Sequence, residues 1–472
     1  MTPEEYRQHD ATGLAALVRR RAVSAEDVLD AMIARAEAVN GTLNAIVLER
    51  YDAARAAIRA GLPDGPFTGV PYFIKDLHAP AIGLPLSHAS RLFAGTDPGF
   101  DSETIARLRR AGFVLAGRTN SPEFGMSAST EPRLHGPTRN PWSPAHSPGG
   151  SSGGAGAAVA GGIVPAAHAT DSLGSIRIPA SCCGLVGLKP TRGRNPVGPH
   201  RGDAMMGLSH EHCVSRSVRD SAAILDATAG PDEGAPWFTA PPAVPFAAEV
   251  GRDPGRLRIG VVTESWTGVG VHPDCVAAVQ HAAQQCAALG HEIVPTRIAV
   301  DGAALFEACN TILLSGLAGL VRMRERELGR PAAPDELEPL TRACVARWES
   351  TPAVALHGAN ARINAIVRQA ARQFRAFDVI LTPMLARPPA LLGELTTDTE
   401  DTDAYLRQLS DYAAFTPLFS ATGQPAMNLP LFRNADGLPI GVQAVAKFAD
   451  DAVLFRLAAQ LEPGFIGLPV DR

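Results

Sequence analysis

Apolar positions in the first 120 residues follow helical spacing in some stretches and strand spacing in others. Ser24 and Asp27 are typical of a capping box, and the pattern around them predicts two helices over residues 10–40. The apolar residues at helical spacing after this box are Val28, Leu29, Met32, Ile33 and Ala36. Short apolar runs at LNAIV, VPYFIKD and FVLAGRT predict strands, and a helix over 101–112 is expected between the last two.

The second half of the chain alternates strand and helix patterns. LRIGVV and HEIVPTRI predict strands on either side of a helix from Pro273 to Leu289, which Gly290 ends. Residues 303–375 have mainly helical spacing, FDVILTP predicts a buried strand, and PAMNLPLF followed by PIGVQAVA predicts a hairpin. Alternation of this kind indicates an α/β sheet protein.

Composition and charge exclude several classes of protein. The 472 residues are 46% hydrophobic and 19% charged, as in ordinary soluble proteins, and the net charge of −5 comes without a long basic stretch. A nucleic-acid binder is therefore not expected. We see no apolar run near the 18 residues of a membrane span and no signal core at the N-terminus, so we expect a cytoplasmic protein without a membrane segment. Seven cysteines without a C-x-x-C pair predict buried, reduced thiols.

Candidate chemistry concentrates in residues 148–191. Ser151 and Ser175 lie there in glycine-rich turns, separated by the small-residue stretch 155–162, which we expect to be a helix buried at the centre. The Pro/Gly/Ser-rich segment 132–154 leads into it, and loops of this length in compact domains are usually functional or disordered.

An isolated lysine, Lys75, is the candidate base for these serines. No nucleophile elbow and no obvious Ser/His/Asp order appear in the chain, so a lysine acting through a second serine is the economical alternative. The lysine must be neutral, which requires its pKa to fall from about 10.4 towards about 7–8. The apolar run VPYFI before Lys75 favours burial, and Asp76 is expected to point away from the amine.

These segments together resemble the amidase signature family. The resemblance rests on GGSSGG, ATDSLGSIRIPA, CGLVGLKPTRGR and VPYFIKD, and extends to TEPRLHGPTRNPW, FDVILTP and GLPIGVQ. It covers nearly the whole chain and is weakest over about 230–375. Within the family, the segments look most like the 6-aminohexanoate cyclic dimer hydrolase branch, which cleaves nylon-oligomer amides.

The resemblance implies a role for each matching position. Lys75 matches the base, Ser151 the bridging serine that follows a cis peptide, and Ser175 the acyl-accepting nucleophile. The oxyanion hole would be formed by the backbone N–H groups of Ser172, Leu173, Gly174 and Ser175. The implied activity is hydrolysis of amide C–N bonds through an acyl-enzyme, with esters and carbamates as neighbouring substrates.

The resemblance also implies the architecture. We expect a large twisted mixed β-sheet covered by helices on both faces, in a single domain over 1–472. Within it lie N-terminal helices (1–60), a catalytic core (61–230 and 376–472) and a variable pocket region (257–410). No metal or cofactor is implied, and the protein would act on a small-molecule amide or carbamate as a monomer or homodimer.

Two positions depart from the family pattern. Ala169 and Leu173 replace glycines of the usual Gly-Thr-Asp-x-Gly-Gly-Ser, so Leu173 is expected in an ordinary backbone region with its side chain narrowing the pocket. Gly125, Met126 and Arg194 are candidate substrate contacts. The apolar stretch 312–321 fits either a core helix or the wall of a channel for the acyl group.

Other functions remain possible from the sequence. The chain could be the A subunit of a tRNA-dependent amidotransferase, although such subunits typically have Gln where Ile178 stands. GGSSGG lacks the ending of a phosphate loop, and His210, Glu211 and His212 lack a second ligand group for a metal. Cys182 and Cys183 are expected to be inert.

Overall fold

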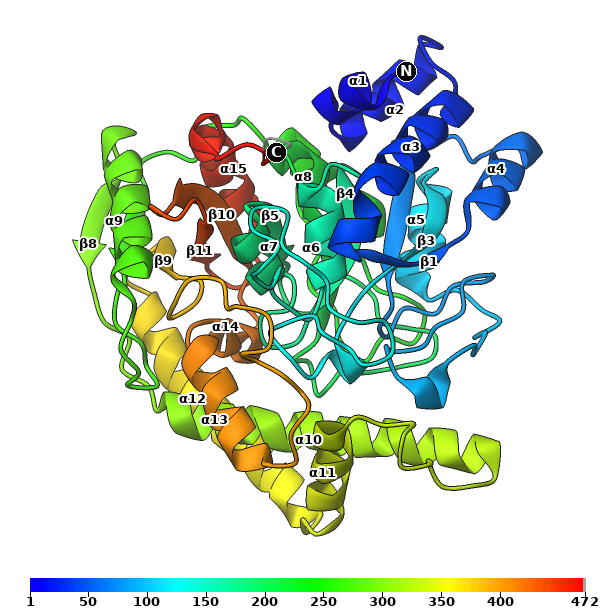
Figure 1. The fold of residues 1–472 in the computed structure, drawn as a ribbon. Helices are drawn as coiled ribbons and strands as arrows, with labels where there is room; N and C mark the ends of the chain where they lie inside the picture. The colour runs from blue at the N-terminus through cyan, green and yellow to red at the C-terminus, as the bar shows by residue number, and fades with distance from the viewer. Residues whose placement is uncertain (470–472) are drawn as a thin grey trace.

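The computed structural model describes residues 1–469, which form two β-sheets surrounded by helices (Figure 1). The larger sheet has eight strands in the order β4-β6-β5-β10-β11-β9-β7-β8, and a separate sheet has the order β1-β3-β2. The large mixed sheet is confirmed, but the sequence did not indicate that the first three strands would form a sheet of their own.

The N-terminal region supplies helices that cover the small sheet. Its elements are α1 (Pro3–Gln8), α2 (Ala11–Arg19), α3 (Ala25–Leu43), β1 (Ile46–Glu49) and α4 (Tyr51–Ala60). The capping box of Ser24 and Asp27 is present at the start of α3, as predicted. Helix α1 was not predicted, although Thr2 and Glu5 form a capping box at its start as well.

The small sheet positions the candidate lysine. Strand β2 (Pro71–Lys75) is parallel to β3 (Val114–Thr119), which pairs antiparallel with β1. Every residue of β2 is buried, which is typical of a strand covered on both faces. Helix α5 (Glu103–Arg110) connects the two parallel strands, as expected.

The large sheet is antiparallel at its centre and parallel at one edge. Strands β10 and β11 form the predicted hairpin, whereas β9, β7 and β8 run parallel. The strands are β4 (Ala166–Asp171), β5 (Val186–Lys189), β6 (His210–Ser215), β7 (Arg258–Val261), β8 (Glu292–Pro295), β9 (Val379–Pro383), β10 (Ala426–Arg433) and β11 (Pro439–Ala446).

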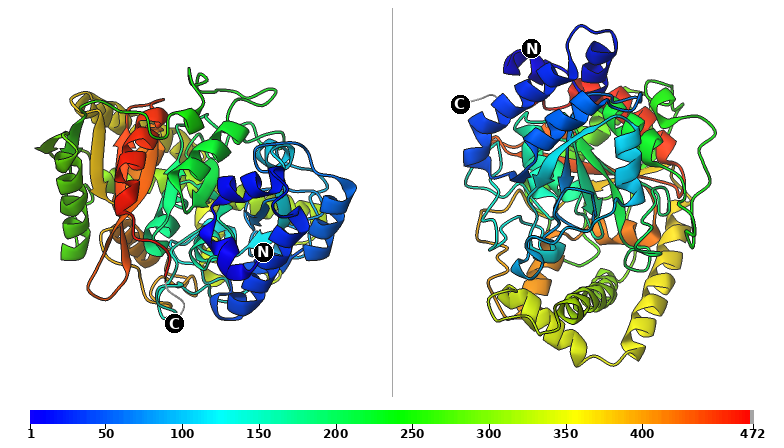
Figure 2. Two further views of the ribbon diagram at one scale, coloured as in Figure 1. Left: turned by 90° about the horizontal axis from the view of Figure 1, so that it is seen from above. Right: turned by 90° about the vertical axis from the view of Figure 1, so that its right-hand side faces the viewer.

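Helices cover both faces of this sheet (Figure 2). One core cluster joins the sheet to α8, α9 and α15, and another joins it to α10, α12 and α14. The helices are α6 (Gly153–Ala160), α7 (Arg177–Cys183), α8 (Val218–Thr228), α9 (Pro273–Ala288), α10 (Gly302–Leu328), α11 (Pro339–Glu349), α12 (Val354–Phe374), α13 (Thr402–Tyr412), α14 (Thr416–Thr422) and α15 (Asp451–Leu461). Short 3-10 turns occupy Arg91–Phe93, Glu123–Gly125, Phe246–Ala248 and Glu462–Gly464.

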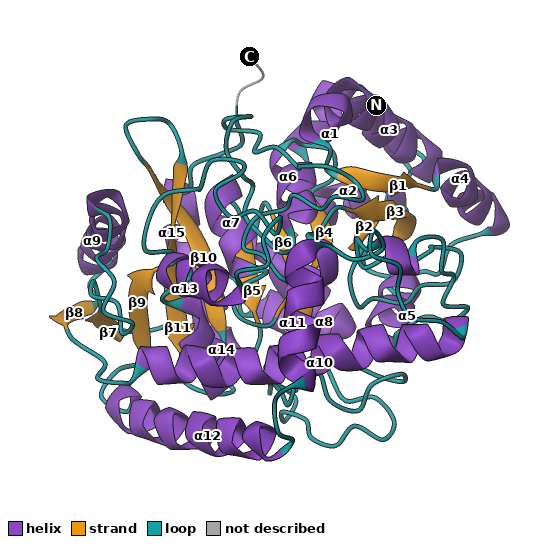
Figure 3. Ribbon diagram, turned by 60° about the horizontal axis from the view of Figure 1, so that its bottom comes forward, coloured by secondary structure: helices purple, strands orange, loops and turns teal. Residues whose placement is uncertain are grey.

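Helix α10 runs along one end of the molecule, below both sheets in Figure 3. By length and composition alone it is the one helix among residues 1–469 that could cross a membrane, which the sequence analysis did not recognise. Glycines and an asparagine interrupt its apolar run, so the helix is apolar enough only in its mean hydropathy and has no unbroken apolar stretch. Its most apolar window is 56% buried inside the molecule, as in the core helix of a folded domain.

Candidate active site

Lys75 ends strand β2 with its side chain completely buried. Its Nζ lies 2.7 Å from Ser151 Oγ and 2.9 Å from Thr170 Oγ1. Burial lowers the pKa of Lys75 from 10.5 to about 7, although the carboxylates of Asp171 and Glu211 oppose this change. A substantial fraction of this amine is therefore neutral near pH 7, as the sequence analysis required.

Asp76 points away from the amine, as expected. Its carboxylate accepts hydrogen bonds from the backbone N–H and the hydroxyl of Ser87. Burial alone would raise the pKa of Asp76, but a hydrogen bond from His135 and the charge of Arg118 help to lower it to about 2. Because Asp76 is satisfied elsewhere, it does not hold Lys75 in the ammonium form.

Ser151 follows a cis peptide bond after Gly150, at the entry to α6. A Cβ at Gly150 would lie 2.6 Å from the carbonyl oxygen of Ser127 and 2.7 Å from that of Ser129, so only glycine fits there. The next residue, Ser152, donates its N–H to the Ser175 carbonyl at 3.3 Å, which ties the two serine turns together.

Ser175 lies in the turn between β4 and α7. Buried ion pairing orders this turn: Arg177 Nε and NH2 donate to the two oxygens of Asp171 at 2.8 and 2.9 Å. Arg177 also bonds Gln443 and Ser420, which anchors the turn to the large sheet and α14. Burial would raise the pKa of Asp171, but the charge of Arg177 holds it well below its usual range. Both residues are thus structural, as expected for Asp171.

The structure corrects one member of the expected oxyanion hole. The N–H of Gly174 donates to Asp171 Oδ1 at 2.7 Å and is therefore already occupied. Within residues 1–469, the N–H groups of Ser172, Leu173 and Ser175 have no hydrogen-bond partner. Gly174 is needed instead for its backbone, because its φ is +141° and a Cβ would lie 2.5 Å from Thr416 Oγ1.

Ser151 and Ser175 line the same cavity, whose volume is about 70 Å³. No hydrogen bond joins their two hydroxyl groups in the described part of the chain. Gly125, Met126 and Leu173 also line this cavity, as the sequence analysis expected. Leu173 is not among the residues with positive φ, so its side chain is accommodated without strain while it narrows the cavity.

Arg194 does not line the cavity, which corrects its assignment as a substrate contact. Its guanidinium donates to Asp451 Oδ2 at 3.0 Å and to the Ala240 carbonyl at 2.6 Å, and lies over the ring of Phe246. Arg194 was considered because it is near the signature in sequence, but the chain after β5 carries it to the side of the sheet where α15 packs.

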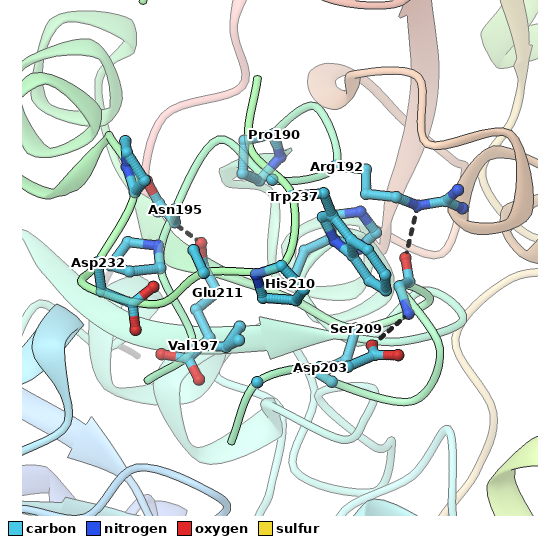
Figure 4. Close-up of a pocket in the computed structure, with 18 of the residues that line it drawn as sticks. Pro190, Arg192, Asn195, Val197, Asp203, Ser209, His210, Glu211, Asp232 and Trp237 are labelled. Atoms are coloured by element: carbon cyan, nitrogen blue, oxygen red, sulfur yellow. Dashed lines mark hydrogen bonds between the residues drawn. The ribbon is translucent and has the colours of Figure 1, made fainter. Parts of the chain in front are cut away.

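Figure 4 shows a second hollow, of about 40 Å³, which contains none of the three candidate catalytic residues. His210 and Glu211 of β6 line it, together with Trp237 and Asp232. Among residues 1–469, no three His, Cys, Asp or Glu side chains are grouped so that they could hold a metal ion. Strand periodicity explains this result, because neighbouring residues of β6 face opposite ways.

Thr170 is the site residue that the sequence analysis missed. It lies on β4, and its hydroxyl is the second partner of Lys75 Nζ. Its place directly before Asp171 in the signature was the available signal, but the contact between the end of β2 and β4 forms only in the tertiary structure.

Comparisons with known proteins identify the family of this chain. The family model described as Amidase matches residues 27–455. The 6-aminohexanoate-cyclic-dimer hydrolase of Paenarthrobacter ureafaciens is 39% identical over 468 residues, which cover 96% of this chain and 94% of that protein.

Solved structures agree as well. A structure of 6-aminohexanoate cyclic dimer hydrolase matches with a TM-score of 0.93 at 36% identity and covers 98% of each chain. A bacterial aryl acylamidase of the amidase signature family matches with a TM-score of 0.86 at 25% identity and covers 96% of each chain. The protein is therefore an amidohydrolase, and its chain belongs to the amidase signature family.

Proposed function

We propose that this amidohydrolase cleaves its substrate through an acyl-enzyme on Ser175, with Ser151 as proton relay and Lys75 as base. The observation that carries the proposal is the 2.7 Å contact between Lys75 Nζ and Ser151 Oγ beside a cavity that Ser175 shares. A neutral lysine amine can donate to Thr170 and still accept the Ser151 proton through its lone pair.

The proton path follows from these contacts. The Ser175 hydroxyl turns towards Ser151 across the shared cavity and passes its proton to Ser151, which passes its own to Lys75. Catalytic hydrogen bonds are often loose in structures without substrate and tighten in the complex. Ser175 Oγ then attacks the amide carbon, and the three free N–H groups of Ser172, Leu173 and Ser175 stabilise the oxyanion.

The second half of the reaction reverses the relay. Collapse of the tetrahedral intermediate breaks the C–N bond, and the proton held by Lys75 returns through Ser151 to the leaving amine. A water molecule then gives its proton to the same relay and hydrolyses the acyl-enzyme. The amine and the acid leave, and Ser175 regains its proton.

The substrate class that fits is an amide with aliphatic or aromatic flanks. Two of the relatives are a hydrolase of the 6-aminohexanoate cyclic dimer and an aryl acylamidase, and the cavity beside Ser175 has mainly apolar walls. Carbamates fit the same acyl transfer: C–N cleavage releases the amine and leaves an alkoxycarbonyl group on Ser175, and its hydrolysis by water gives the alcohol and carbon dioxide. We propose that the chain works alone in the cytoplasm, as a monomer or homodimer.

The experiment is turnover of a panel containing cyclic and linear aminohexanoate oligomers, p-nitroanilides and aryl carbamates. Ser175→Ala is expected to lower kcat by about 10⁴-fold or more, since the nucleophile is lost. Mass spectrometry of the quenched wild-type enzyme should find the acyl group on the peptide that contains Ser175. Ser350→Ala, at an exposed serine after α11, is the matched control and should keep wild-type turnover.

Undiminished turnover by Ser175→Ala would contradict the mechanism. The alternative function, an amidotransferase A subunit, predicts that the purified chain hydrolyses nothing in the panel and is active only with partner subunits. Gel filtration of the active fraction distinguishes the two possibilities.

A further inference from the structure

A larger cavity, of about 730 Å³ and distinct from the hollow in Figure 4, adjoins the cavity of Ser151 and Ser175, which is called the catalytic cavity here. One wall is the face of α10 that carries Leu313, Gly316 and Leu320. The opposite wall comes from loops that contain Phe93, Phe100 and Met205. The sequence analysis left open whether 312–321 is core or channel wall, and here one face of the segment is buried while the other lines a cavity.

The two cavities share part of their lining. The shared residues are His78, Phe124, Met126, Met205 and Leu313, and the place where they bring the two cavities together is called the neck. A substrate whose reacting bond lies at Ser175 can therefore extend past this neck without leaving the protein.

The volumes require such an extension. Sites that bind small molecules commonly measure about 300–1,000 Å³. The catalytic cavity, at about 70 Å³, holds little more than the reacting bond, whereas the adjoining cavity is large enough for a drug-sized group. The remainder of any substrate larger than a simple amide has room only in the adjoining cavity of about 730 Å³.

The chemistry of the walls indicates a neutral, apolar occupant. The two arginines that line the cavity are ion-paired: Arg324 Nη1 lies 3.1 Å from Glu327, and Arg201 Nη2 lies 3.2 Å from Glu211. The exposed carboxylates of Asp97 and Asp203 accept hydrogen bonds from the backbone N–H groups of Gly99 and Gly207. Burial lowers the pKa of His88 to about 3, so this ring is neutral at pH 7. An anionic ligand group would lose its hydration here without gaining an unpaired cation, and the mainly apolar lining favours an uncharged group.

The backbone around the neck is held in an uncommon conformation. His78, His88, Phe124 and Met205 have φ between +49° and +55°, a region that residues other than glycine rarely adopt. Strained backbone of this kind clusters at ligand sites, where the surrounding structure holds it in place.

We propose that the cavity between α10 and the loops carrying Phe93, Phe100 and Met205 binds an uncharged alkyl or aryl arm attached to one side of the scissile bond. This inference rests on the proposed function for the position of that bond. Burial of apolar surface is the driving force, and each methylene placed in the cavity is worth about a fourfold gain in affinity.

Binding to the Ser175→Ala protein tests the inference without turnover. Isothermal titration would compare N-phenylacetamide with N-phenylhexanamide, which lengthens the acyl arm, and N-methylbenzamide with N-hexylbenzamide, which lengthens the amine arm. In one of these pairs the longer compound should bind at least tenfold more tightly. Adding Gly316→Phe should remove that gain, because a Cβ at Gly316 approaches only Met205 Cε, at 3.9 Å, so the ring can occupy the cavity.

Gly358→Phe is the matched control, since Gly358 is also an exposed helical glycine with open space around its Cβ, but on α12 and away from the cavity. It should preserve the gain. Equal affinities within both pairs, or a gain that persists in the Gly316→Phe protein, would overturn the inference. A gain that Gly316→Phe removes, in a protein whose wild type hydrolyses none of the four compounds, would support the cavity assignment and count against the proposed function.

Discussion

At the scale of single residues, the proposed mechanism depends on a lysine held where water cannot solvate its charge. Lys75 has a completely buried side chain, and its amine contacts two hydroxyl groups, on Ser151 and Thr170. The nearby carboxylates of Asp171 and Glu211 oppose deprotonation, and Asp171 is itself neutralised by Arg177. The pKa of Lys75 thus reflects a balance in which burial is the largest effect.

The activity should increase with pH through an apparent pKa near 7. Only the neutral amine can accept the Ser151 proton, and burial lowers the pKa of Lys75 to about 7. The measurement is kcat/KM of the wild-type enzyme for a neutral anilide between pH 5 and pH 9. A rising limb centred above about pH 9 would contradict a neutral Lys75 as base.

The stability of the protein provides an independent check on the same group. Between pH 7 and 10.5 the unfolded chain keeps a proton on this lysine that the folded protein has released. Because the unfolded state then binds more protons, the free energy of unfolding should rise with pH across this window. The Lys75→Met variant should lack this part of the slope in urea unfolding experiments.

At the scale of elements, helix α6 brings the signature into close contact with the rest of the core. All eight of its residues are buried, and none is larger than valine. Small side chains allow the backbone of α6 to approach the ends of β1 and β3, where Ala45 and Asn120 lie. The turn that carries Ser151 is consequently supported by backbone on several sides.

Two glycines of α6 should differ sharply in their tolerance of alanine. A Cβ at Gly154 would lie 2.3 Å from Asn120 N and 2.7 Å from the Ala45 carbonyl oxygen, both backbone atoms that cannot move away. Gly154→Ala should therefore lower the free energy of unfolding by at least about 2 kcal/mol, measured by urea denaturation.

Gly156→Ala is the matched control, because its Cβ would meet Cys183 Sγ at 3.1 Å and Pro179 Cβ at 3.2 Å. The better helix propensity of alanine offsets this tighter fit, so Gly156→Ala should change the free energy of unfolding by no more than about 1 kcal/mol. Equal losses in the two variants would show that backbone proximity is not the reason for glycine at position 154.

At the scale of the whole molecule, two sheets meet at the active site. The small sheet supplies Lys75 from β2, and the large sheet supplies Thr170 from β4 and anchors the Ser175 turn through Arg177 and Gln443. The site therefore depends on the packing of the complete fold, which also buries all seven cysteines as free thiols.

The native protein should be nearly inert towards thiol reagents. Burial raises the pKa of Cys182 and of Cys309 to about 12, so that little thiolate forms at pH 8. Titration with an aromatic disulfide reagent should label less than about one thiol per chain in the native state and all seven in guanidinium chloride. Rapid labelling of several thiols without loss of structure would contradict the buried arrangement.

Local patterns in the sequence were sufficient for several helices, such as α3, α6 and α9, and for most strands, whereas α1, α4, α8 and α15 were not predicted. The three candidate catalytic residues were assigned from these patterns together with the family resemblance. Turn-forming glycines and helix caps act over a few residues, so the capping box at Ser24 and the hairpin of β10 and β11 could be predicted. The burial of α6 followed from its lack of large side chains. The choice of Lys75 followed from the apolar strand before it, together with the family resemblance.

Tertiary structure decided what depends on segments far apart in the chain. Lys75 and Ser151 are 76 residues apart and Lys75 and Thr170 are 95 apart, so no periodicity relates them. The N–H of Gly174 is taken by Asp171, and Arg194 binds Asp451 from the other end of the chain. Hydrogen-bond partners and cavities are set by which surfaces pack together, and local spacing carries no information about that packing.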